Sequence, residues 1–357
     1  MSVEFKLAPA DLRSVPEVEQ IVEREGLGLL SSESLSTFPG RNENWAGTTS
    51  TGAEIFVKKI DGPHAAERFR RALSFTLFES ADIPSPKCIS WDNGSHVFIF
   101  ELLDGSCSGN KVARDGSFTA ETAFEAGRIV GRLHQVSCTE VGLDTTPPNW
   151  PQLAGLTNLS VSTFAACSGA QLELFALLQG DAALVDSITE LVEVSRQAPK
   201  APAHCDLRLD QFLVHEGKLY LGDWEELRAE DPARDVGAFI GEWVYRAVQA
   251  IGENGDATAE TVLSCGVREL ERRRPFLEAF WSGYRAACTV SDPGLRSRST
   301  AFAGWHLVDR VLASSTERSR LHALDRATIG IARNLVCSPD LFCEAVGLST
   351  TVEGVRS

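Results

Sequence analysis

The segment AHCDLRLDQFLVHEGKLYLGDWEE, residues 203–226, holds the most informative spacing in this chain. It contains His204 and Asp206, an amide side chain at Gln211 five residues after that aspartate, and a second aspartate, Asp223. Between the amide and the second aspartate, two short apolar runs flank a glycine-containing turn, which predicts a β-hairpin. A hairpin would bring Gln211 and Asp223 to the same end, close to one another.

This spacing fits the transfer of a phosphoryl group from ATP to a hydroxyl. The reaction needs an acceptor for the hydroxyl proton and metal ions over the phosphates. We therefore expect His204 and Asp206 to form the catalytic loop, while Gln211 and Asp223 supply oxygens to Mg²⁺, a hard cation that keeps few protein ligands. An acidic loop followed by an ordinary hairpin is the alternative interpretation, but the combined spacing favours the catalytic one.

The pattern resembles the aminoglycoside phosphotransferase and choline kinase superfamily, whose catalytic segment commonly reads HGDLxxxN and is followed by a strand ending in Asp, an aromatic residue and Glu or Asp. His204, Asp206, Asp223 and Glu225 match this pattern. The resemblance implies an α+β, bilobal, protein-kinase-like fold. Residues 1–104 would form a small β-rich N-lobe, and residues 105–357 a larger, mostly helical C-lobe with the catalytic loop and a substrate-binding insertion.

Two positions depart from that pattern. Cys205 stands where the superfamily usually has Gly, and Gln211 stands where it usually has Asn. We interpret Cys205 as a small residue that fills the Gly position, with a reactive thiol as the alternative. Gln can still offer a carbonyl oxygen to a metal, and maltokinase-like members of the superfamily also carry it.

Composition limits the class of partner and the cellular location that we expect. The 357 residues are 43% hydrophobic, which suffices for two lobes with cores, and the formal net charge of −15 argues against nucleic acid as a partner. No apolar stretch is long enough to span a bilayer and no signal segment opens the sequence, so we expect a cytoplasmic protein without a membrane partner. Nine cysteines without CxxC pairs suggest thiols in a reducing compartment.

Residues 38–59, FPGRNENWAGTTSTGAEIFVKK, predict a glycine-containing turn, a strand, a tight turn and a second strand. Gly40, Asn44 and Gly47 are the candidate nucleotide-binding residues here, because glycines let the backbone approach phosphates closely. Lys58 follows an apolar triplet and would bridge the α- and β-phosphates, whereas Lys59 points to the other face of the strand. A plain hairpin is equally consistent with the loop alone.

A helix is expected from about residue 63 to residue 80, and kinases need a glutamate on it to fix the phosphate lysine. Glu67 is preferred and Glu79 is the reserve, since the arginine cluster at residues 68–71 suggests that much of this helix is solvated. Residues 97–105 predict a buried strand that runs into a turn. Backbone groups from Glu101 to Leu103 would pair with adenine there, unless this is simply one more core strand.

The remaining sequence is predominantly helical. His134, in a helix over residues 119–137, is expected to be a packing histidine, and Asp235 to cap the following long helix and brace the catalytic loop. Further helices should fill residues 236–251, 257–290 with a break or kink at Pro275, and 298–346. The basic run at residues 272–274 reads as a solvated face or a dock for an acidic peptide.

The segments FPGRNENWAGTT, AAERFRRALSF, HCDLRLDQFLV and LGDWEE together resemble the kinase subunits of class V lanthipeptide synthetases and of related thioamide-peptide pathways. The resemblance implies ATP- and Mg²⁺-dependent phosphorylation of Ser and Thr in a ribosomal precursor peptide, with separate lyase and cyclase proteins as partners. Two alternatives stay open: a small-molecule kinase acting on an aminoglycoside, amino alcohol or sugar, and a catalytically weak scaffold that holds a peptide.

Overall fold

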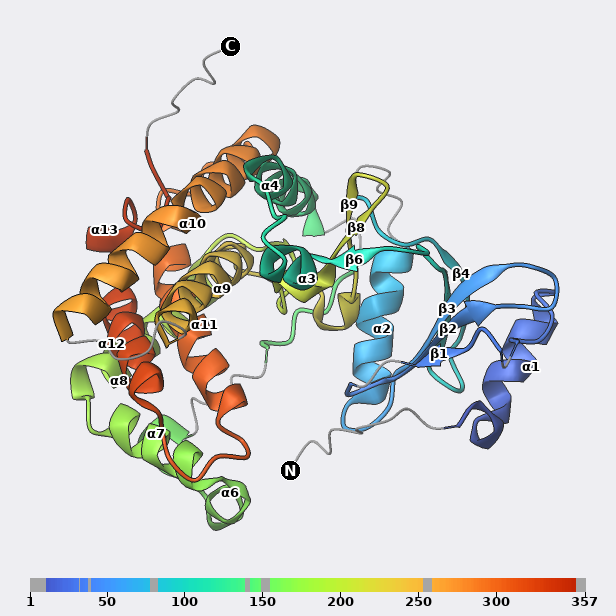
Figure 1. Cartoon of the computed structure of the whole chain (residues 1–357), viewed down its shortest axis with the longest axis horizontal. Coiled ribbons are helices and arrows are strands. Elements are labelled where there is room, and N and C mark those ends of the chain that lie inside the picture. The colour runs from blue at the N-terminus through green and yellow to red at the C-terminus, as the bar shows by residue number, and fades with distance from the viewer. Residues whose placement is uncertain are drawn as a thin grey trace. The chain divides into compact units, whose positions relative to one another are not determined.

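The computed structural model describes residues 11–31, 33–37, 40–77, 83–138, 142–148, 155–252 and 259–350. The chain forms two compact units (Figure 1). The β-rich unit consists of Ser2–Gly109 and Gln211–Leu227, and the helical unit of Asn110–Asp210 and Arg228–Ser357. This division differs from the expected boundary after residue 104, because residues 211–227 form strands and side-chain contacts within the β-rich unit.

The β-rich unit begins with a 3₁₀ turn, Leu12–Ser14, and helix α1, Pro16–Arg24. Its main antiparallel sheet has the strand order β1-β2-β3-β5-β4, with bounds Ser36–Thr37, Glu43–Thr48, Glu54–Lys59, Val97–Glu101 and Cys88–Asp92 in that order. Helix α2 spans Ala65–Thr76. A second antiparallel sheet joins β6, Cys107–Ser108, to the hairpin of β8, Phe212–His215, and β9, Lys218–Leu221, which a 3₁₀ turn at Trp224–Glu226 follows.

Strand β3 shows how alternation orients the two lysines. Ile55 and Val57 are fully buried in a core that includes residues of α1, so the odd-numbered side chains face that helix. Lys59 continues on the same face and its Nζ lies 2.6 Å from Glu17 of α1. Lys58 therefore points to the opposite face of the sheet, as expected.

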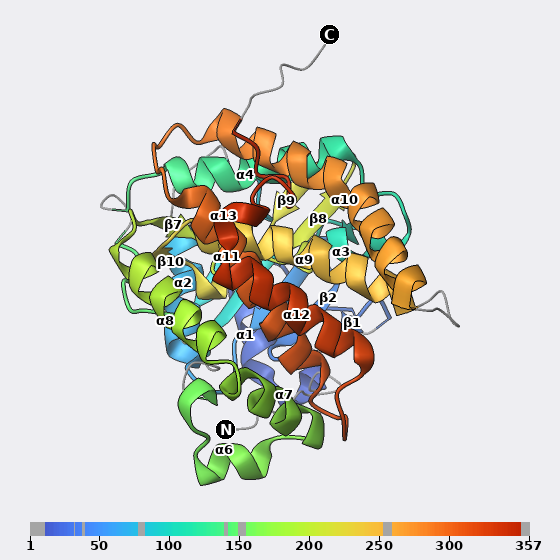
Figure 2. The ribbon, with the colours of Figure 1, turned by 90° about the vertical axis from the view of Figure 1, so that its left-hand side faces the viewer.

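The helical unit contains α3 (Gly109–Arg114), α4 (Ala120–Gln135), α6 (Val161–Ala166), α7 (Gly169–Gln179), α8 (Ala182–Gln197), α9 (Ala233–Gly252), α10 (Ala259–Ala287), α11 (Leu295–Ser314), α12 (Ala323–Cys337) and α13 (Pro339–Phe342). Helix α10 packs against α4, and α11 packs against both α9 and α12 (Figure 2). Strands β7, Ala201–Ala203, and β10, Arg228–Glu230, form a short antiparallel ladder.

One helical expectation was wrong, because the single run expected over residues 298–346 is divided into α11, α12 and α13. Of the break or kink expected at Pro275, the break does not occur, since α10 continues through Pro275. Among the described residues, no helix combines the length and the apolar character needed to cross a membrane.

Candidate active site

The expected hairpin is present between the two predicted metal ligands, Gln211 and Asp223. Phe212 of β8 is paired with Leu221 of β9, and the Gly222 N–H donates a 3.0 Å hydrogen bond to the Gln211 carbonyl. The open end of the hairpin thus brings Gln211 close to the residue before Asp223. Asp223 has a left-handed backbone with φ of +67°, a conformation that Asp tolerates better than most residues.

Lys58 and Asp223 meet within the β-rich unit. The Lys58 ammonium forms an ion pair with the Asp223 carboxylate and lies 3.5 Å from Oε2 of Glu225. Burial alone would lower the pKa of Lys58, but the charges of Asp223 and Glu225 outweigh it and raise that pKa above its usual value. Lys58 is therefore a cation fixed by two carboxylates that both follow β9.

The partner expected from α2 is not the one observed. Within the described residues Glu67 forms no ion pair with Lys58, and Glu79 lies outside them. The arginine cluster of α2 also differs from the expected solvated face, since Arg68 and Arg71 are 2% and 7% exposed and only Arg70 faces solvent. Residues three apart share one side of a helix, so both buried arginines point inward together.

Glu225 is the buried centre of this part of the unit. Its carboxylate pairs with Arg41, accepts a 2.7 Å hydrogen bond from Nδ2 of Asn42, and faces Lys58. Burial would raise the pKa of Glu225, but the charges of Lys58, Arg41 and Arg68 lower it well below its usual range. Glu225 is therefore ionised at neutral pH and offsets several cations.

The helix arginines complete the same network. Arg68 donates to Oδ1 of Asn42 at 2.9 Å, and Arg71 donates to the Glu225 carbonyl at 3.1 Å and to Glu226 at 2.7 Å. Arg41 and Asn42 were not among the predicted site residues, although both lie in the segment FPGRNENWAGTT. The contacts show that this segment, α2 and the turn after β9 form one polar cluster.

The three candidates from residues 40–47 have different environments. Gly47 is buried inside β2, where a Cβ would lie 3.2 Å from the Ser34 carbonyl oxygen. Its lack of a side chain thus accommodates the backbone segment at Ser34 and Leu35. Asn44 lies opposite Lys58 in the β2–β3 ladder. Gly40 precedes β2, and a Cβ there would meet nothing closer than Asn44 Nδ2, at 4.0 Å.

The predicted adenine-binding backbone follows β5. The Glu101 N–H donates to the Lys87 carbonyl at 2.9 Å and the Leu102 N–H donates to the Glu54 carbonyl at 3.1 Å, so both are used within the unit. The Leu103 carbonyl accepts from Ser106 at 3.0 Å. The Leu103 N–H forms no hydrogen bond among the described residues, which leaves it as the available donor of this segment.

In the helical unit, the predicted catalytic loop begins directly after β7. His204 is fully buried, and the backbone N–H groups of His204 and Cys205 donate to Asp235 at 2.6 and 2.9 Å. Cys205 has a φ of +62°, which explains why Gly is the usual residue at this position. Burial raises the pKa of the Cys205 thiol, and the Asp235 charge raises it further, so this thiol is not an activated nucleophile.

Asp235 braces the loop from the first turn of α9. The cap of α9 differs from expectation, because the Ala233 N–H at the start of the helix donates to Asp231 at 3.0 Å rather than to Asp235. His134 places Nε2 3.1 Å from Asp235 and Nδ1 3.1 Å from the Tyr284 hydroxyl, so it is a buried, hydrogen-bonded packing residue. Burial would raise the pKa of Asp235, but the His134 hydrogen bond and the His204 contacts lower it.

Asp206 lies further along the same loop and is more accessible. Its side chain is 39% exposed, and its carboxylate lies 3.4 Å from Nη2 of Arg208. The predicted catalytic residues His204 and Asp206 thus belong to the helical unit, while Gln211 and Asp223 belong to the β-rich unit.

The donor set suits a hard cation with few protein ligands. No group of three or more His, Cys, Asp or Glu side chains arranged for a metal occurs in the described part of the chain. Mg²⁺ does not require one, because it retains waters and substrate phosphates beside one or two protein oxygens. The amide of Gln211 and the carboxylate of Asp223 offer oxygen atoms of that kind.

The fold and these residues define a phosphotransferase with the bilobal, α+β architecture of kinases. Residues 34–276 match the phosphotransferase enzyme family, APH, and the chain belongs to that family. A search of curated proteins gave no match.

Solved structures agree on the fold. Choline kinase LicA from Streptococcus pneumoniae is 13% identical with a TM-score of 0.52, and the alignment covers 91% of this chain and 99% of that one. Amicoumacin kinase hAmiN, in complex with AMP-PNP, Ca²⁺ and Ami, is also 13% identical with a TM-score of 0.52, covering 92% and 96%. A putative fructosamine-3-kinase from Haemophilus somnus 129PT is 14% identical with a TM-score of 0.51, covering 89% and 96%.

Proposed function

We propose that this protein is an ATP- and Mg²⁺-dependent kinase that phosphorylates Ser and Thr hydroxyls of a ribosomal precursor peptide, ahead of phosphate elimination by a separate lyase. The observation that supports the peptide substrate is the buried network around Glu225. Its members come from three of the four segments that resemble the kinase subunits of lanthipeptide synthetases, namely FPGRNENWAGTT, AAERFRRALSF and LGDWEE. A resemblance is better supported when the matching segments contact one another in the structure than when each segment matches in isolation.

The nucleotide would be held by the β-rich unit. Gln211 and Asp223 would hold Mg²⁺, which when bound neutralises phosphate charge during transfer. Lys58 would contact the phosphates, and because Glu225 also lies 3.5 Å from its Nζ, Lys58 can leave Asp223 and keep an anionic partner. The Leu103 N–H, which has no hydrogen-bond partner among the described residues, would donate to adenine, while Gly40 and Asn44 lie on the segment that precedes and begins β2.

The helical unit would supply the proton acceptor. The Asp206 carboxylate would take the proton of the acceptor hydroxyl as that oxygen attacks the γ-phosphoryl group. His204 is fully buried, so we assign it a positioning role in the loop that Asp235 braces. Phosphorylation has a chemical purpose in such a pathway, since phosphate leaves readily from a Ser or Thr side chain where hydroxide does not.

Intact mass spectrometry tests this proposal directly. A candidate precursor peptide is incubated with the protein, ATP and Mg²⁺, with and without a candidate lyase. A gain of about 80 Da, converted to a loss of water when lyase is present, supports a peptide Ser/Thr kinase. Asp206→Asn should slow the mass gain by about two to four powers of ten without changing the melting temperature.

Two controls separate the alternatives. Asp223→Ala should lose Mg²⁺-dependent nucleotide binding by calorimetry, and unchanged titration of Mg·ATP would contradict the metal role of Asp223. If no peptide gains mass while a panel of aminoglycosides, amino alcohols and sugars is phosphorylated, the protein is a small-molecule kinase. Peptide binding without any ATP turnover would instead favour a scaffold.

A further inference from the structure

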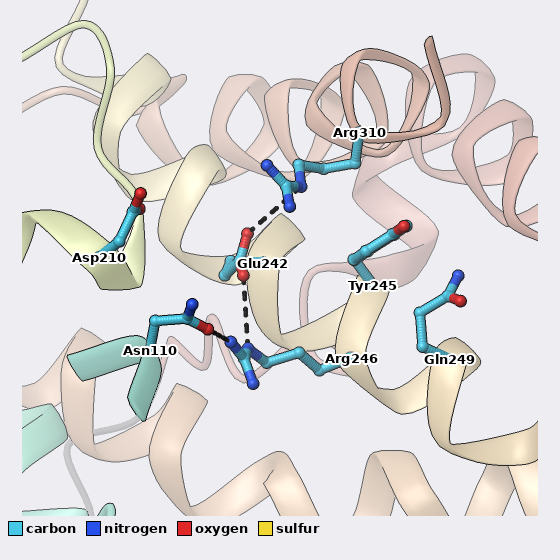
Figure 3. A pocket seen from close by; sticks show the side chains of 7 residues that line it. All are labelled: Asn110, Asp210, Glu242, Tyr245, Arg246, Gln249 and Arg310. Carbon is cyan, nitrogen blue, oxygen red and sulfur yellow. Dashed lines mark hydrogen bonds and ion pairs between the residues drawn. The ribbon is translucent and has the colours of Figure 1, made fainter. Parts of the chain in front are cut away.

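The helical unit contains a polar cavity of about 250 Å³ beside the catalytic loop (Figure 3). Most of its lining comes from α9, with Arg310 contributed by α11 and Asn110 by α3. Asp210, the fourth residue after Asp206, also lines it. The cavity therefore includes part of the loop that carries the proposed proton acceptor.

Close packing of two helices assembles the cavity. Tyr245, Arg246 and Gln249 follow Glu242 by three, four and seven residues on α9, which places them near Glu242 on one side of the helix. Gly241 lets α11 approach, because a Cβ there would lie 2.8 Å from the Cβ of His306. One turn further along α11 is Arg310, which this approach brings to Glu242.

Glu242 is the buried charge at the centre. It is 6% exposed, and its carboxylate oxygens lie 3.3 Å from Nε of Arg246, 3.7 Å from Nε of Arg310 and 3.3 Å from Nε2 of His306. Burial would raise the pKa of Glu242, but the hydrogen bond of His306 and the charges of His306, Arg310 and Arg246 lower it to about 2. One carboxylate thus faces two permanent cations, and positive charge is in excess here.

The two guanidinium groups are held in fixed orientations on opposite sides of Glu242 (Figure 3). Arg246 donates to Oδ1 of Asn110, and Arg310 stacks over the ring of Tyr245 with 5.4 Å between Cζ and the ring centroid. In the described residues, Nε2 of Gln249 is buried without a hydrogen-bond partner, and the Nε atoms of both arginines face Glu242 without forming a hydrogen bond. The cavity therefore offers oriented donors in excess of its acceptors, which an oxyanion can satisfy.

A short contact chain links this cavity to Asp206. Arg208 lies 3.4 Å from Asp206 and 3.5 Å from Asp210, so it bridges the proposed proton acceptor and the cavity wall. Arg208 is shared between Asp206 and Asp210, but the Asp210 side chain is 46% exposed, so solvent screens its charge more than it screens the buried charges around Glu242. A group bound in the cavity against Arg246 and Arg310, beside Glu242, would belong to a substrate that also reaches the predicted catalytic loop.

We propose that this cavity binds a carboxylate or phosphate group of the acceptor, so that the enzyme prefers Ser or Thr residues with an acidic or phosphorylated neighbour. That the acceptor is a peptide rests on the proposed function; the oxyanion chemistry of the cavity does not. A chain with a net charge of −15 repels anions overall, so such a preference requires a local basic site. The same chemistry disfavours a polycationic antibiotic as the acceptor.

Fluorescence polarisation with the full-length protein tests the preference without requiring catalysis. The labelled peptides are identical except for Glu, Gln, Lys or phosphoserine next to the acceptor Ser. Wild-type protein should bind the Glu peptide about tenfold more tightly than the Gln peptide. The phosphoserine peptide then shows which oxyanion is preferred. Equal binding of the Glu and Gln peptides would overturn the proposal.

Substitutions test whether the two cavity arginines cause the preference for the Glu peptide. Arg310→Gln should remove the Glu preference, and Arg246→Gln should do the same if the first variant does not fold. Arg333→Gln is the matched control, because Arg333 is an exposed arginine on α12 that pairs with Asp181 at 2.5 Å. A Glu preference that survives both cavity substitutions would refute the assignment.

A peptide-free measurement separates this inference from the proposed function. Inorganic phosphate should raise the melting temperature of the wild-type protein more than that of Arg310→Gln, with Arg333→Gln behaving like wild type. An Arg310-dependent shift in a protein that phosphorylates no peptide would retain the oxyanion site and reject the peptide substrate. If the protein phosphorylates a peptide but neither peptide binding nor the phosphate-induced melting shift depends on Arg310, the peptide substrate is retained and the oxyanion site is rejected.

Discussion

Replacing Glu225 by Gln should strongly destabilise the β-rich unit. Glu225 is 4% exposed and offsets Arg41, Lys58 and, through Asn42, Arg68. At an effective dielectric constant of about 20, a charge pair at 3.5 Å interacts by roughly 5 kcal/mol before desolvation is subtracted. Removing one partner from a buried ion pair typically costs about 3–5 kcal/mol, so we expect a loss of about 3 kcal/mol.

Urea unfolding followed by tryptophan fluorescence measures this loss, since Trp224 stacks on Phe75 within the same unit with ring centroids 3.6 Å apart. With a slope of about 2 kcal/mol per molar urea, the midpoint should fall by about 1.5 M. Glu226→Gln is the comparison variant in the next position; its side chain is 24% exposed, against 5% for Glu225, so its loss should cost clearly less. Equal losses of unfolding free energy in both variants would refute the conclusion that Glu225 is the buried centre of this network.

The pH dependence provides a second check on Glu225. Because its pKa is lowered in the folded protein, its contribution is fully present above the unfolded carboxyl pKa of about 4.3 and is lost as the pH falls below that value. The difference in unfolding midpoint between wild type and Glu225→Gln should therefore be constant from pH 6 to 8 and shrink on acidification. A difference that grows on acidification would have the wrong sign for this mechanism.

Three further outcomes are expected. Asp206→Asn should lower kcat by about two to four powers of ten with an unchanged melting temperature, because its side chain is 39% exposed; activity near wild type would exclude it as the proton acceptor. Cys205→Gly should raise the unfolding free energy by about 1 kcal/mol and retain activity, since it removes the strain of a left-handed cysteine; a lower urea midpoint would contradict this. Asp235→Asn should cost about 2–4 kcal/mol and lower kcat more than it raises the KM for ATP, because one backbone N–H of the loop loses its charged acceptor; an altered KM alone would argue against a bracing role.

Local patterns predicted the elements that depend on local chemistry. The hairpin between Gln211 and Asp223 follows from two apolar runs around a Glu-Gly turn, and the opposite directions of Lys58 and Lys59 follow from strand alternation. The brace from Asp235 to the catalytic loop was also expected, on the resemblance to the superfamily. In each case the required signal lies within a few residues or in a shared motif.

Partners distant in sequence could not be predicted in the same way. From sequence alone, a cluster of arginines on a helix predicts a solvated face, because the hydrogen-bond acceptors of the arginines are not known. The acceptors of Arg71 lie 154 and 155 positions later in the chain. The same absence of long-range information favoured Glu67 as the partner of Lys58, where the structure has Asp223 and Glu225. The Arg246 and Arg310 cavity was missed for that reason too, since each arginine alone resembles an ordinary helix residue.

The β-rich unit is discontinuous in the chain, and this limits how the protein can be dissected. A fragment ending at Gly109 would lack the hairpin that pairs with β6, the aromatic partner of Phe75 and the carboxylates that offset Lys58, Arg41 and Arg71. Such a fragment would carry uncompensated cations and an uncovered helix. A stable version of this unit therefore needs Gln211–Leu227 joined back to it, so simple truncation is a poor route to an isolated nucleotide-binding domain.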